Sequence, residues 1–302
     1  MNKLPVGETI GSAYGFTFGQ IGAIIGLIWI PTLINAVGSF FIFGAYNGAM
    51  QQTSGDGMPM MAGPYVGLMF LYFLVAFLLV AMMAVAITKQ VLGLRSGTPF
   101  AYFSLGSAEL RVFGGIFALY LLFVLFFLVF AIVVVVVGIV GSTLAKQSAA
   151  VAPLVGALVG LLAIAGFGAM IYIFVRLSFL FVPSAVVDGE FGLSRSWQLT
   201  AGNFWRIVVV GLAVMLPLLL VQGVSEYFIL GPEYFNSFAH AMQDPTNASR
   251  FSIEQAQIVQ PRIPLLLGLG LILAPIVQGL LFATPAFAYR ALAGRAVPTQ
   301  GS

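Results

Sequence analysis

Six long apolar stretches, separated by short polar segments, constrain this chain more than any other feature. They cover residues 21–43, 65–88, 113–140, 151–175, 207–230 and 263–289. A helix of about 20 apolar residues crosses the hydrocarbon core of a bilayer, and every stretch reaches that length. Only 7% of the 302 residues are charged, against about a quarter in a soluble domain. The sequence therefore predicts an all-α, polytopic membrane bundle with six spans, forming one domain over residues 1–302.

Two of the stretches invite a different interpretation. Residues 131–140, AIVVVVVGIV, are β-branched enough to suit a strand in water. In lipid an isolated strand leaves its backbone groups without hydrogen-bond partners, so we predict a helix there. The first stretch is longer than the apolar core of a cleavable signal peptide, and residues 45–47 do not form a small-residue cleavage site. We expect it to remain as a span.

Basic residues divide unevenly between the two sides of the predicted bundle. With the amino terminus in the cytoplasm, nine of the twelve lysines and arginines fall in cytoplasmic segments. These nine are Lys3, Lys89, Arg95, Arg111, Arg176, Arg195, Arg206, Arg290 and Arg295, and the other three are Lys146, Arg250 and Arg262. This excess predicts that both termini are cytoplasmic. Nucleic-acid binding would require a basic face on a soluble domain, so nucleic acid is not an expected partner.

The spacing of three phenylalanines indicates an internal repeat. Phe18, Phe113 and Phe204 open alternate spans and lie 95 and 91 residues apart, and Pro31 and Pro217 each follow thirteen residues after their phenylalanine. We interpret this pattern as three parallel copies of an interfacial helix followed by two spans. The predicted units are residues 1–94, 95–185 and 186–302. Before the third span, the interfacial segment is represented by Phe100, Phe103, Ser107 and Leu110.

The segment FGLSRSWQLTAGNFWR, residues 191–206, is the predicted interfacial helix of the third unit. Helical spacing places Leu193 and Trp197 on one side and Arg195 on the other. Gly202 can end this helix in the left-handed conformation, and Asn203 can cap the next one. Asp188 and Glu190 precede the segment, where carboxylates stabilise a helix amino terminus.

This segment is either a structural anchor or a dedicated site for a lipid or partner. Tryptophan prefers the depth of the lipid headgroups, and arginine pairs with lipid phosphate. We favour the anchor interpretation and keep the lipid site as the alternative. The candidate lipid or interface residues are Arg176, Arg195, Trp197, Trp205 and Arg206.

Glycines recur every four residues at the start of the chain. Small residues on one helix face allow two helices to approach closely in lipid. We expect contact within the same chain rather than a dimer interface. The predicted packing glycines are Gly7, Gly11, Gly15, Gly19, Gly22 and Gly26.

Residues 176–206 carry a pattern of basic, acidic, aromatic and hydroxyl residues that points to a known family. The pattern consists of Arg176, Pro183, Asp188, Ser196-Trp197, Leu199-Thr200, Gly202 and Trp205-Arg206. It resembles the membrane domain fused to some bacterial glycerophosphodiester phosphodiesterases, and related stand-alone inner-membrane proteins. The resemblance implies an all-helical bundle in the bacterial cytoplasmic (inner) membrane, without catalytic residues in the membrane part. Because the chain ends at Ser302, where a phosphodiesterase half would follow, we expect no such activity.

Residues able to perform catalysis are scarce. The single histidine, His240, cannot build a metal site alone, and the chain has no cysteine. Thioether ligands from the methionines at 58–61 lack a supporting histidine or cysteine, and we interpret Asp188 and Glu190 as helix caps. We therefore expect neither enzymatic activity nor a metal ion or other cofactor.

Three amide side chains are the main polar groups within the spans: Asn35, Gln222 and Gln278. We expect them to form hydrogen bonds between helices. Glu226 lies near the outer end of the fifth span. Four prolines also interrupt the spans, and they are able to break helices around a cavity. They are Pro31, Pro217, Pro275 and Pro285.

These features lead to two alternative functions. The first is a non-enzymatic membrane scaffold or lipid-interacting accessory protein, with membrane lipids and a protein as candidate partners. The alternative is a transporter of lipids or small amphiphiles. Coupling to protons or ions is not expected, because such carriers place ionisable residues deep within their spans.

The loop between the fifth and sixth spans, residues 231–262, is expected to form a helical cap. Pro232 suits a first helical turn, and an apolar side follows it. That side consists of Tyr234, Phe235, Phe238 and Met242. Asp244-Pro245 marks a break, and Ser252 with Gln255 forms a capping box that opens a second helix.

The predicted topology is tested with reporter fusions. Fusions after Ser96, Ser194 and Ser302 should report the cytoplasm, and fusions near Asp56, Ser148 and Asn247 the other side. Enzymatic reporters that are active on only one side of the membrane make this measurement. A far-side signal at Ser194 would contradict the three-unit interpretation, because the third unit would then be inverted relative to the other two.

Overall fold

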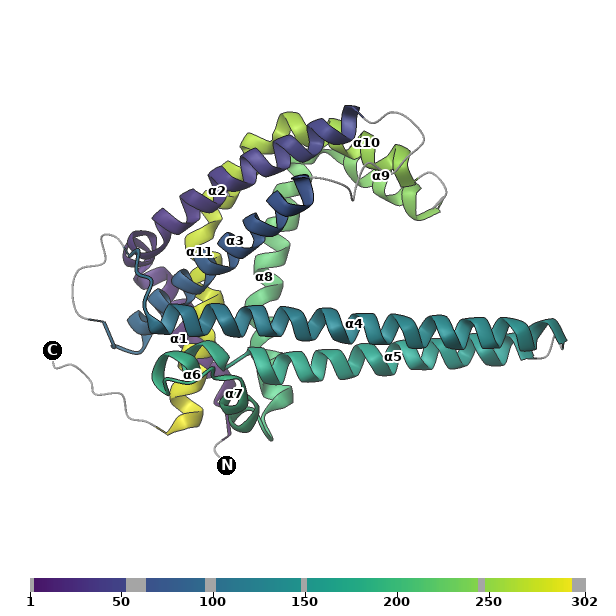
Figure 1. The fold of residues 1–302 in the computed structure, drawn as a ribbon. Helices are drawn as coiled ribbons and strands as arrows, with labels where there is room; N and C mark the ends of the chain where they lie inside the picture. Colours follow the sequence, from purple (N-terminus) through teal and green to yellow (C-terminus); the bar gives the residue numbers. More distant parts are fainter. Residues whose placement is uncertain (1–2, 53–63, 96–101, 148–150, 244–247, 295–302) are drawn as a thin grey trace.

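The protein is a helical bundle from which one long hairpin extends (Figure 1). The computed structural model describes residues 3–52, 64–95, 102–147, 151–243 and 248–294. Six helices of this described part are long and apolar enough to cross a membrane, as predicted. The described residues contain helices and no strand, so the all-α prediction is confirmed.

The helices follow one another with short connections. The spanning helices are α2 (Ile21–Gln52), α3 (Pro64–Val91), α4 (Ser107–Gln147), α5 (Val151–Ser178), α8 (Phe204–Leu230) and α11 (Ile263–Ala293). The shorter elements are α1 (Val6–Gly19), α6 (Phe181–Val187), α7 (Leu193–Leu199), α9 (Pro232–Gln243), α10 (Ala248–Val259) and η2 (Gln260–Arg262). The short helices α6 and α7 lie at one end of the bundle, and α9 and α10 lie at the other (Figure 1).

Helix α11 is the centre of the bundle and contacts α1, α2, α3, α6 and α8. The main core lies toward the α6–α7 end, where Leu27 of α2, Ile87 of α3 and Phe282 of α11 are buried together. Gly279 permits a close approach of α11 to α1, because a Cβ there would lie only 2.7 Å from Cγ2 of Thr17. In the contact between these two helices, the glycine therefore comes from the last span.

The glycines at the start of the chain do not make such a contact. Gly7, Gly11, Gly15 and Gly19 are exposed, and a Cβ on any of them would meet no other atom within 4 Å. Gly22 is also exposed with open space around it, and Gly26 is half-buried. Helix α1 packs through its opposite face, on which Thr9, Ala13 and Thr17 are buried. The expectation that this glycine face packs within the chain is wrong, because the threonine and alanine face is the one turned toward α8 and α11.

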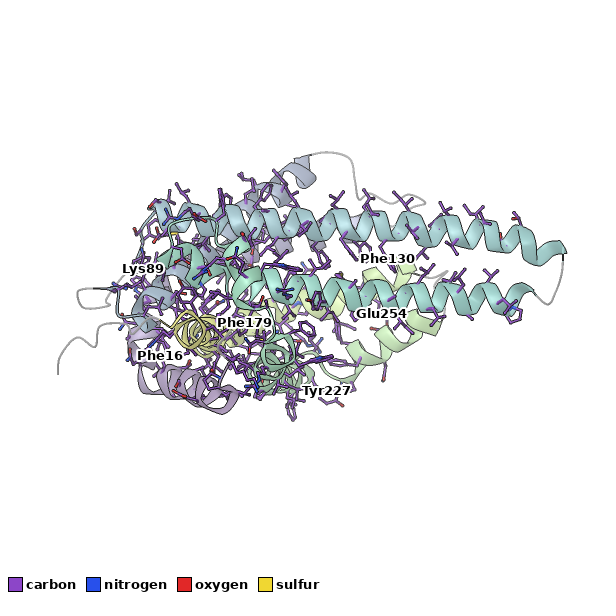
Figure 2. All side chains as sticks on the ribbon, turned by 90° about the horizontal axis from the view of Figure 1, so that it is seen from below. Phe16, Lys89, Phe130, Phe179, Tyr227 and Glu254 are labelled. Carbon is purple, nitrogen blue, oxygen red and sulfur yellow. The ribbon has the colours of Figure 1, made fainter. Side chains whose placement is uncertain are left out.

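Helices α4 and α5 pair along their length and extend away from the bundle (Figures 1 and 2). Two glycines allow this close pairing: a Cβ at Gly166 would lie 2.3 Å from the ring of Phe130, and one at Gly141 would lie 2.1 Å from Val155. The remaining surface of the hairpin is lined with exposed leucine, valine, isoleucine and phenylalanine. Such a surface is suited to acyl chains and unsuited to water.

The threefold repeat is not confirmed. The first and third units each begin with a short helix, a break and a span, namely α1 then α2, and α7 then α8. The left-handed Gly202, with φ +74°, makes the predicted turn before α8. In the second unit the predicted break is missing, because the described part of that segment passes into one continuous helix, α4, that includes Phe113. Phe100 and the methionines at 58–61 lie outside the described residues.

The cap at the α9–α10 end matches the prediction in outline. Helix α9 begins at Pro232, and a second helix, α10, follows it. The capping box at Ser252 and Gln255 is wrong, because α10 already begins at Ala248 and Ser252 lies inside it. Asp244-Pro245 lies outside the described residues.

One hydrogen bond compensates for a proline within α8. Pro217 has no N–H, so the carbonyl of Ala213 lacks its usual partner four residues later. The hydroxyl of Tyr14, on α1, donates a hydrogen bond to that carbonyl at 3.2 Å. In a membrane an unpaired backbone carbonyl is costly, so this contact both stabilises the interrupted helix and positions α1 against it.

Replacing Tyr14 with phenylalanine should lower the free energy of unfolding by about 1 kcal/mol or more, because the Ala213 carbonyl is left without a donor. Thermal unfolding in detergent micelles measures the loss. Tyr120→Phe is the matched control, since Tyr120 is half-exposed and its hydroxyl makes no hydrogen bond to the described residues. Equal melting temperatures for the two variants would contradict the proposed compensation.

Candidate functional site

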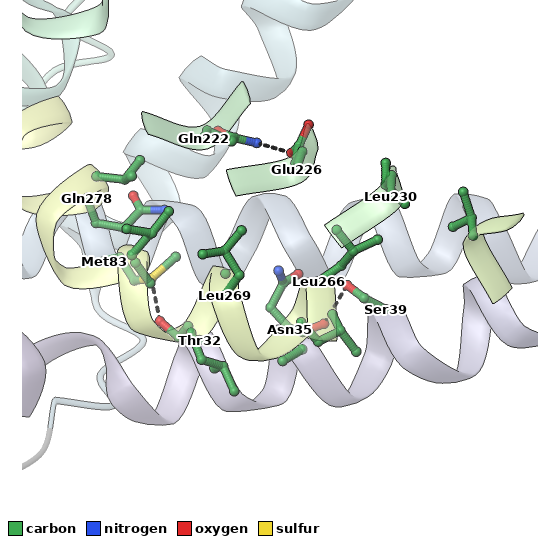
Figure 3. A pocket seen from close by; sticks show the side chains of 18 of the residues that line it. Thr32, Asn35, Ser39, Met83, Gln222, Glu226, Leu230, Leu266, Leu269 and Gln278 are labelled. Carbon is green, nitrogen blue, oxygen red and sulfur yellow. Dashed lines mark hydrogen bonds between the residues drawn. The ribbon is translucent and has the colours of Figure 1, made fainter. Parts of the chain in front are cut away.

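A cavity of about 510 Å³ lies toward the α9–α10 end of the bundle. Helices α2, α8 and α11 form most of its wall, with contributions from Met83 of α3, Tyr234 of α9 and Val259 of α10. Figure 3 shows Gln222 and Glu226 of α8 on one side of this space, and Thr32 and Asn35 of α2 on another. The volume falls within the range of pockets that hold small molecules in proteins, about 300–1,000 Å³.

The three amides predicted from the sequence all line this cavity. Asn35 forms the expected contact between helices, since its Oδ1 accepts a hydrogen bond from the Tyr72 hydroxyl of α3 at 3.2 Å. Gln222 instead donates from Nε2 to Glu226 Oε1 at 2.9 Å, within α8. Oε1 of Gln278 is buried and accepts no hydrogen bond from the described residues. The expectation of bonds between helices is correct for Asn35 and wrong for the two glutamines.

An apolar groove of about 190 Å³ adjoins the cavity between α2 and α11. The two spaces share Thr32, Leu271 and Ala274 in their walls. The groove is otherwise lined by Ile25, Ile28, Trp29, Leu33 and Pro275. Because Trp29 and Leu33 are more than 40% exposed, the groove reaches the outer surface of the bundle.

Prolines lie at the junction of the two spaces. Pro31 immediately precedes Thr32 on α2, and Pro275 immediately follows Ala274 on α11. A proline inside a helix removes one backbone hydrogen bond and prevents regular close packing around the preceding turn. The predicted role of these two prolines beside a cavity agrees with their positions, whereas Pro285 is buried in the core.

The cavity is closed toward the α6–α7 end. Ile24 and Ile28 of α2, Met83 of α3 and Leu280 of α11 are all at most 4% exposed there. The contact between Gly279 and Thr17 lies in the same layer. The space therefore opens along α2 and α11 at the side of the bundle, and a packed core closes it toward the α6–α7 end.

The residues predicted to contact lipid lie at the other end, and Arg176 joins two helices there. It is 9% exposed. Its guanidinium lies 3.8 Å from the ring centre of Trp197 and donates to the Tyr172 hydroxyl at 2.9 Å and to the Trp197 carbonyl. Ser196 Oγ donates to the Arg176 carbonyl at 2.9 Å, and Thr200 Oγ1 also donates to it, at 3.3 Å. We call these contacts the α5–α7 clasp, and they connect residues of the pattern that carried the family resemblance.

Arg206 and Asn203 hold the start of the chain. Arg206 Nη1 donates to the Leu4 carbonyl at 2.8 Å, and the Leu4 N–H donates to Asn203 Oδ1 at 3.0 Å. Asn203 occupies the position before α8, but its side chain does not cap that helix as expected. It is committed to Leu4 instead, a contact that spans 199 residues and has no signal in the local sequence.

The acidic residue of the pattern also has a structural role. Asp188 follows α6 and accepts hydrogen bonds from the Tyr289 hydroxyl of α11 at 3.0 and 3.1 Å. Arg195 lies 3.9 Å from the same carboxylate and remains partly exposed. The interpretation of Asp188 as the amino-terminal cap of α7 is wrong, because Gly192 occupies that position. Trp205 is 75% exposed and stays available to the membrane.

A second polar cluster, which the sequence analysis missed, fixes the start of α4. Glu109 is 1% exposed and accepts from Lys89 Nζ at 3.2 Å, from the Tyr102 hydroxyl and from the Gly106 N–H at 3.0 Å. Burial, with the neighbouring Glu109 carboxylate, raises the pKa of Tyr102. The three-residue spacing of Gly106 and Glu109 was the available signal, since a glutamate there commonly bonds back to the helix start.

Comparison with known proteins gives one result. Residues 4–292 match a family described as a domain of unknown function, DUF7847. The chain belongs to the DUF7847 family. The matched region includes every spanning helix, so the cavity, the groove and the α5–α7 clasp are all parts of the DUF7847 domain. No curated protein and no solved structure matches the chain.

Removing the unpartnered oxygen from the cavity of this DUF7847 protein should stabilise it. Gln278→Leu keeps a similar side-chain volume and removes a buried amide oxygen that accepts no hydrogen bond from the described residues. The free energy of unfolding should therefore rise by about 1 kcal/mol. Thermal unfolding of the empty protein measures the change. Gln222→Leu is the contrast, because it removes the donor to Glu226 and should not stabilise. A lower melting temperature for Gln278→Leu would show that this oxygen has a partner.

Proposed function

We propose that this protein binds a lipid or small amphiphile in the cavity and acts as a non-enzymatic, lipid-interacting accessory protein of the membrane. One observation carries the proposal: a cavity with a few polar side chains in a mostly apolar wall continues into an apolar groove that reaches the bundle surface. An amphiphile has the same division into a polar head and an apolar tail. Its head would contact the amides, and its tail would follow the groove past Trp29 and Leu33.

The polar groups support binding more than catalysis. Amides such as Asn35, Gln222 and Gln278 offer hydrogen bonds but do not exchange protons near neutral pH. Among the described residues that line the cavity, they accompany a single carboxylate, that of Glu226. Such a set orients a bound head group without supplying the paired acid and base that hydrolysis commonly requires.

We place lipid binding ahead of a purely scaffolding role for a physical reason. The exposed apolar faces of α4 and α5 are what any spanning helix presents to lipid, so they do not by themselves indicate a protein partner. The cavity is a more specific feature. We also infer that kinship with the membrane domain of glycerophosphodiester phosphodiesterases, suggested by residues 176–206, agrees with a lipid-related role.

Transport of the same amphiphile is the second candidate. Pro31, Pro217 and Pro275 interrupt the three helices that form most of the cavity wall, and such helices can change shape more readily than regular ones. A transporter would have to open the packed layer formed by Ile28, Met83 and Leu280. A lipid-flip assay in reconstituted vesicles distinguishes the two functions, since binding alone moves no lipid between leaflets.

The predicted orientation would place the cavity in the outer leaflet. We infer that the protein lies in the bacterial inner membrane with both termini in the cytoplasm, from the excess of basic residues on that side. The α6–α7 end would then face the cytoplasm, and the cavity near α9 and α10 would be reached by lipids of the opposite leaflet.

Filling the cavity should abolish lipid binding. Ala36 lines the cavity, and Ala36→Phe would occupy much of the space beside Asn35. We expect the lipid that is retained through detergent purification, measured by mass spectrometry of the intact protein, to fall at least tenfold. Ala118→Phe is the matched control, because Ala118 is exposed on α4 and lies away from the cavity. Equal retention in the two variants would rule out the cavity as the lipid site.

A further inference from the structure

We infer that the head group bound in the cavity is a protonated primary amine. This inference rests on the proposed function and specifies its ligand. The decisive feature is Glu226, a carboxylate that lines the cavity, because the described residues that line it with Glu226 include no lysine, arginine or histidine.

Glu226 is paired only with neutral groups in the described structure. Gln222 donates to its Oε1 at 2.9 Å. The two ion pairs of the described residues are elsewhere, between Lys89 and Glu109 and between Arg195 and Asp188. Arg262, at the same end of the bundle, donates to the Ile258 carbonyl at 2.8 Å. Glu226 is half-buried beside the cavity. A carboxylate that is partly removed from water is costly without a positive partner, and a cationic head group would supply one.

The other polar atoms of the cavity favour an amine that carries hydrogens. A primary ammonium has three N–H donors and no acceptor. Besides the Glu226 carboxylate, the cavity offers Gln278 Oε1, which is buried and unpartnered among the described residues. Figure 3 shows Gln278 and Glu226 among the side chains that surround the same space. The cavity therefore offers an ammonium group a carboxylate at Glu226, and elsewhere in its wall an acceptor at Gln278 that has no partner among the described residues.

A quaternary ammonium fits less well. Such groups have no N–H to donate and are typically bound by several aromatic rings. Among the described residues that line the cavity, Tyr234 is the one aromatic side chain. An anionic head group is opposed directly, because the carboxylate of Glu226 would repel it.

Trp29 provides a local signal for the test. It lines the apolar groove, so a brominated tail lying there would quench its fluorescence. The full-length protein in detergent micelles is titrated with tail-brominated amphiphiles of equal chain length that carry a primary amine, a trimethylammonium, an alcohol or a carboxylate. The same titrations on Trp29→Phe give the signal of the other two tryptophans, which is subtracted.

We expect the primary amine to bind at least tenfold more tightly than the alcohol or the trimethylammonium, and the carboxylate to bind weakest. Glu226→Gln should weaken binding of the amine about tenfold, because it removes a charge-assisted hydrogen bond. The affinity for the alcohol should not change. Glu233→Gln is the control, because Glu233 is exposed on α9 and outside the cavity. Glu226→Asp, which retains the charge, should retain the preference for the amine.

The outcomes separate the two proposals. If no amphiphile quenches Trp29, the proposed function fails. If all head groups quench equally, or if the carboxylate binds best, amphiphile binding stands and the amine inference is overturned. Should Glu226→Gln fail to fold, the ranking of head groups on the unaltered protein decides the matter by itself.

A primary ammonium has two possible sources in a membrane, an ethanolamine phospholipid and a free long-chain amine. A brominated ethanolamine phospholipid and its glycerol-head counterpart are therefore titrated beside the alkylamine. Preferential quenching by the ethanolamine lipid assigns the site to phospholipid. Quenching by the alkylamine alone assigns the site to a free amphiphilic amine. The phosphate of the phospholipid would in that case prevent its head group from binding near Glu226.

Discussion

The structure depends on the requirement that backbone groups in a membrane find partners within the protein. This requirement converts even the valine-rich run of α4 into helix, and it makes each interrupted turn consequential. At Pro217 the freed carbonyl of Ala213 is satisfied by Tyr14 from another helix. Pro31 and Pro275 lie where α2 and α11 border the groove and cavity. Proline thus coincides with a tertiary contact in α8 and with open space between α2 and α11.

The two ends of the bundle differ in the space that they leave beside polar side chains. At the α6–α7 end, the buried polar groups Arg176, Asn203 and Glu109 are engaged with other parts of the chain. Together with the Asp188–Tyr289 contact they close that end. At the α9–α10 end, Gln278 and Glu226 border a cavity and leave bonding capacity unused within the described residues. A packed α6–α7 end and a cavity with polar side chains at the opposite end form an arrangement suited to holding a ligand on one side of a membrane.

The segment 191–206 illustrates how a sequence pattern can mark residues as important without showing whether they contact lipid or anchor the fold. Its tryptophans and arginines have the composition of a lipid-contact helix. In the fold, Arg176 and Trp197 contact each other, and Arg206 binds the Leu4 carbonyl, so the contacts favour the anchor interpretation. Arg195 and Trp205 remain exposed to a degree that permits membrane contact. The distinction rests on partners such as Leu4, which lie about two hundred residues away in the chain.

Hydropathy by itself determined the helical class and the six spans, because membrane thickness and backbone pairing leave few alternatives. Pro232 and the apolar side that follows it indicated the helical cap. Hydropathy also identified Asn35, Gln222 and Gln278 as unusual, since amides are costly in lipid. Only the tertiary structure decided that these three line one cavity, that α1 packs by its threonine face and not by its glycines, and that α4 has no break at Phe113. The physical reason is that hydropathy and helical spacing are local properties, whereas a cavity and a helix interface depend on which side chains from distant segments come together.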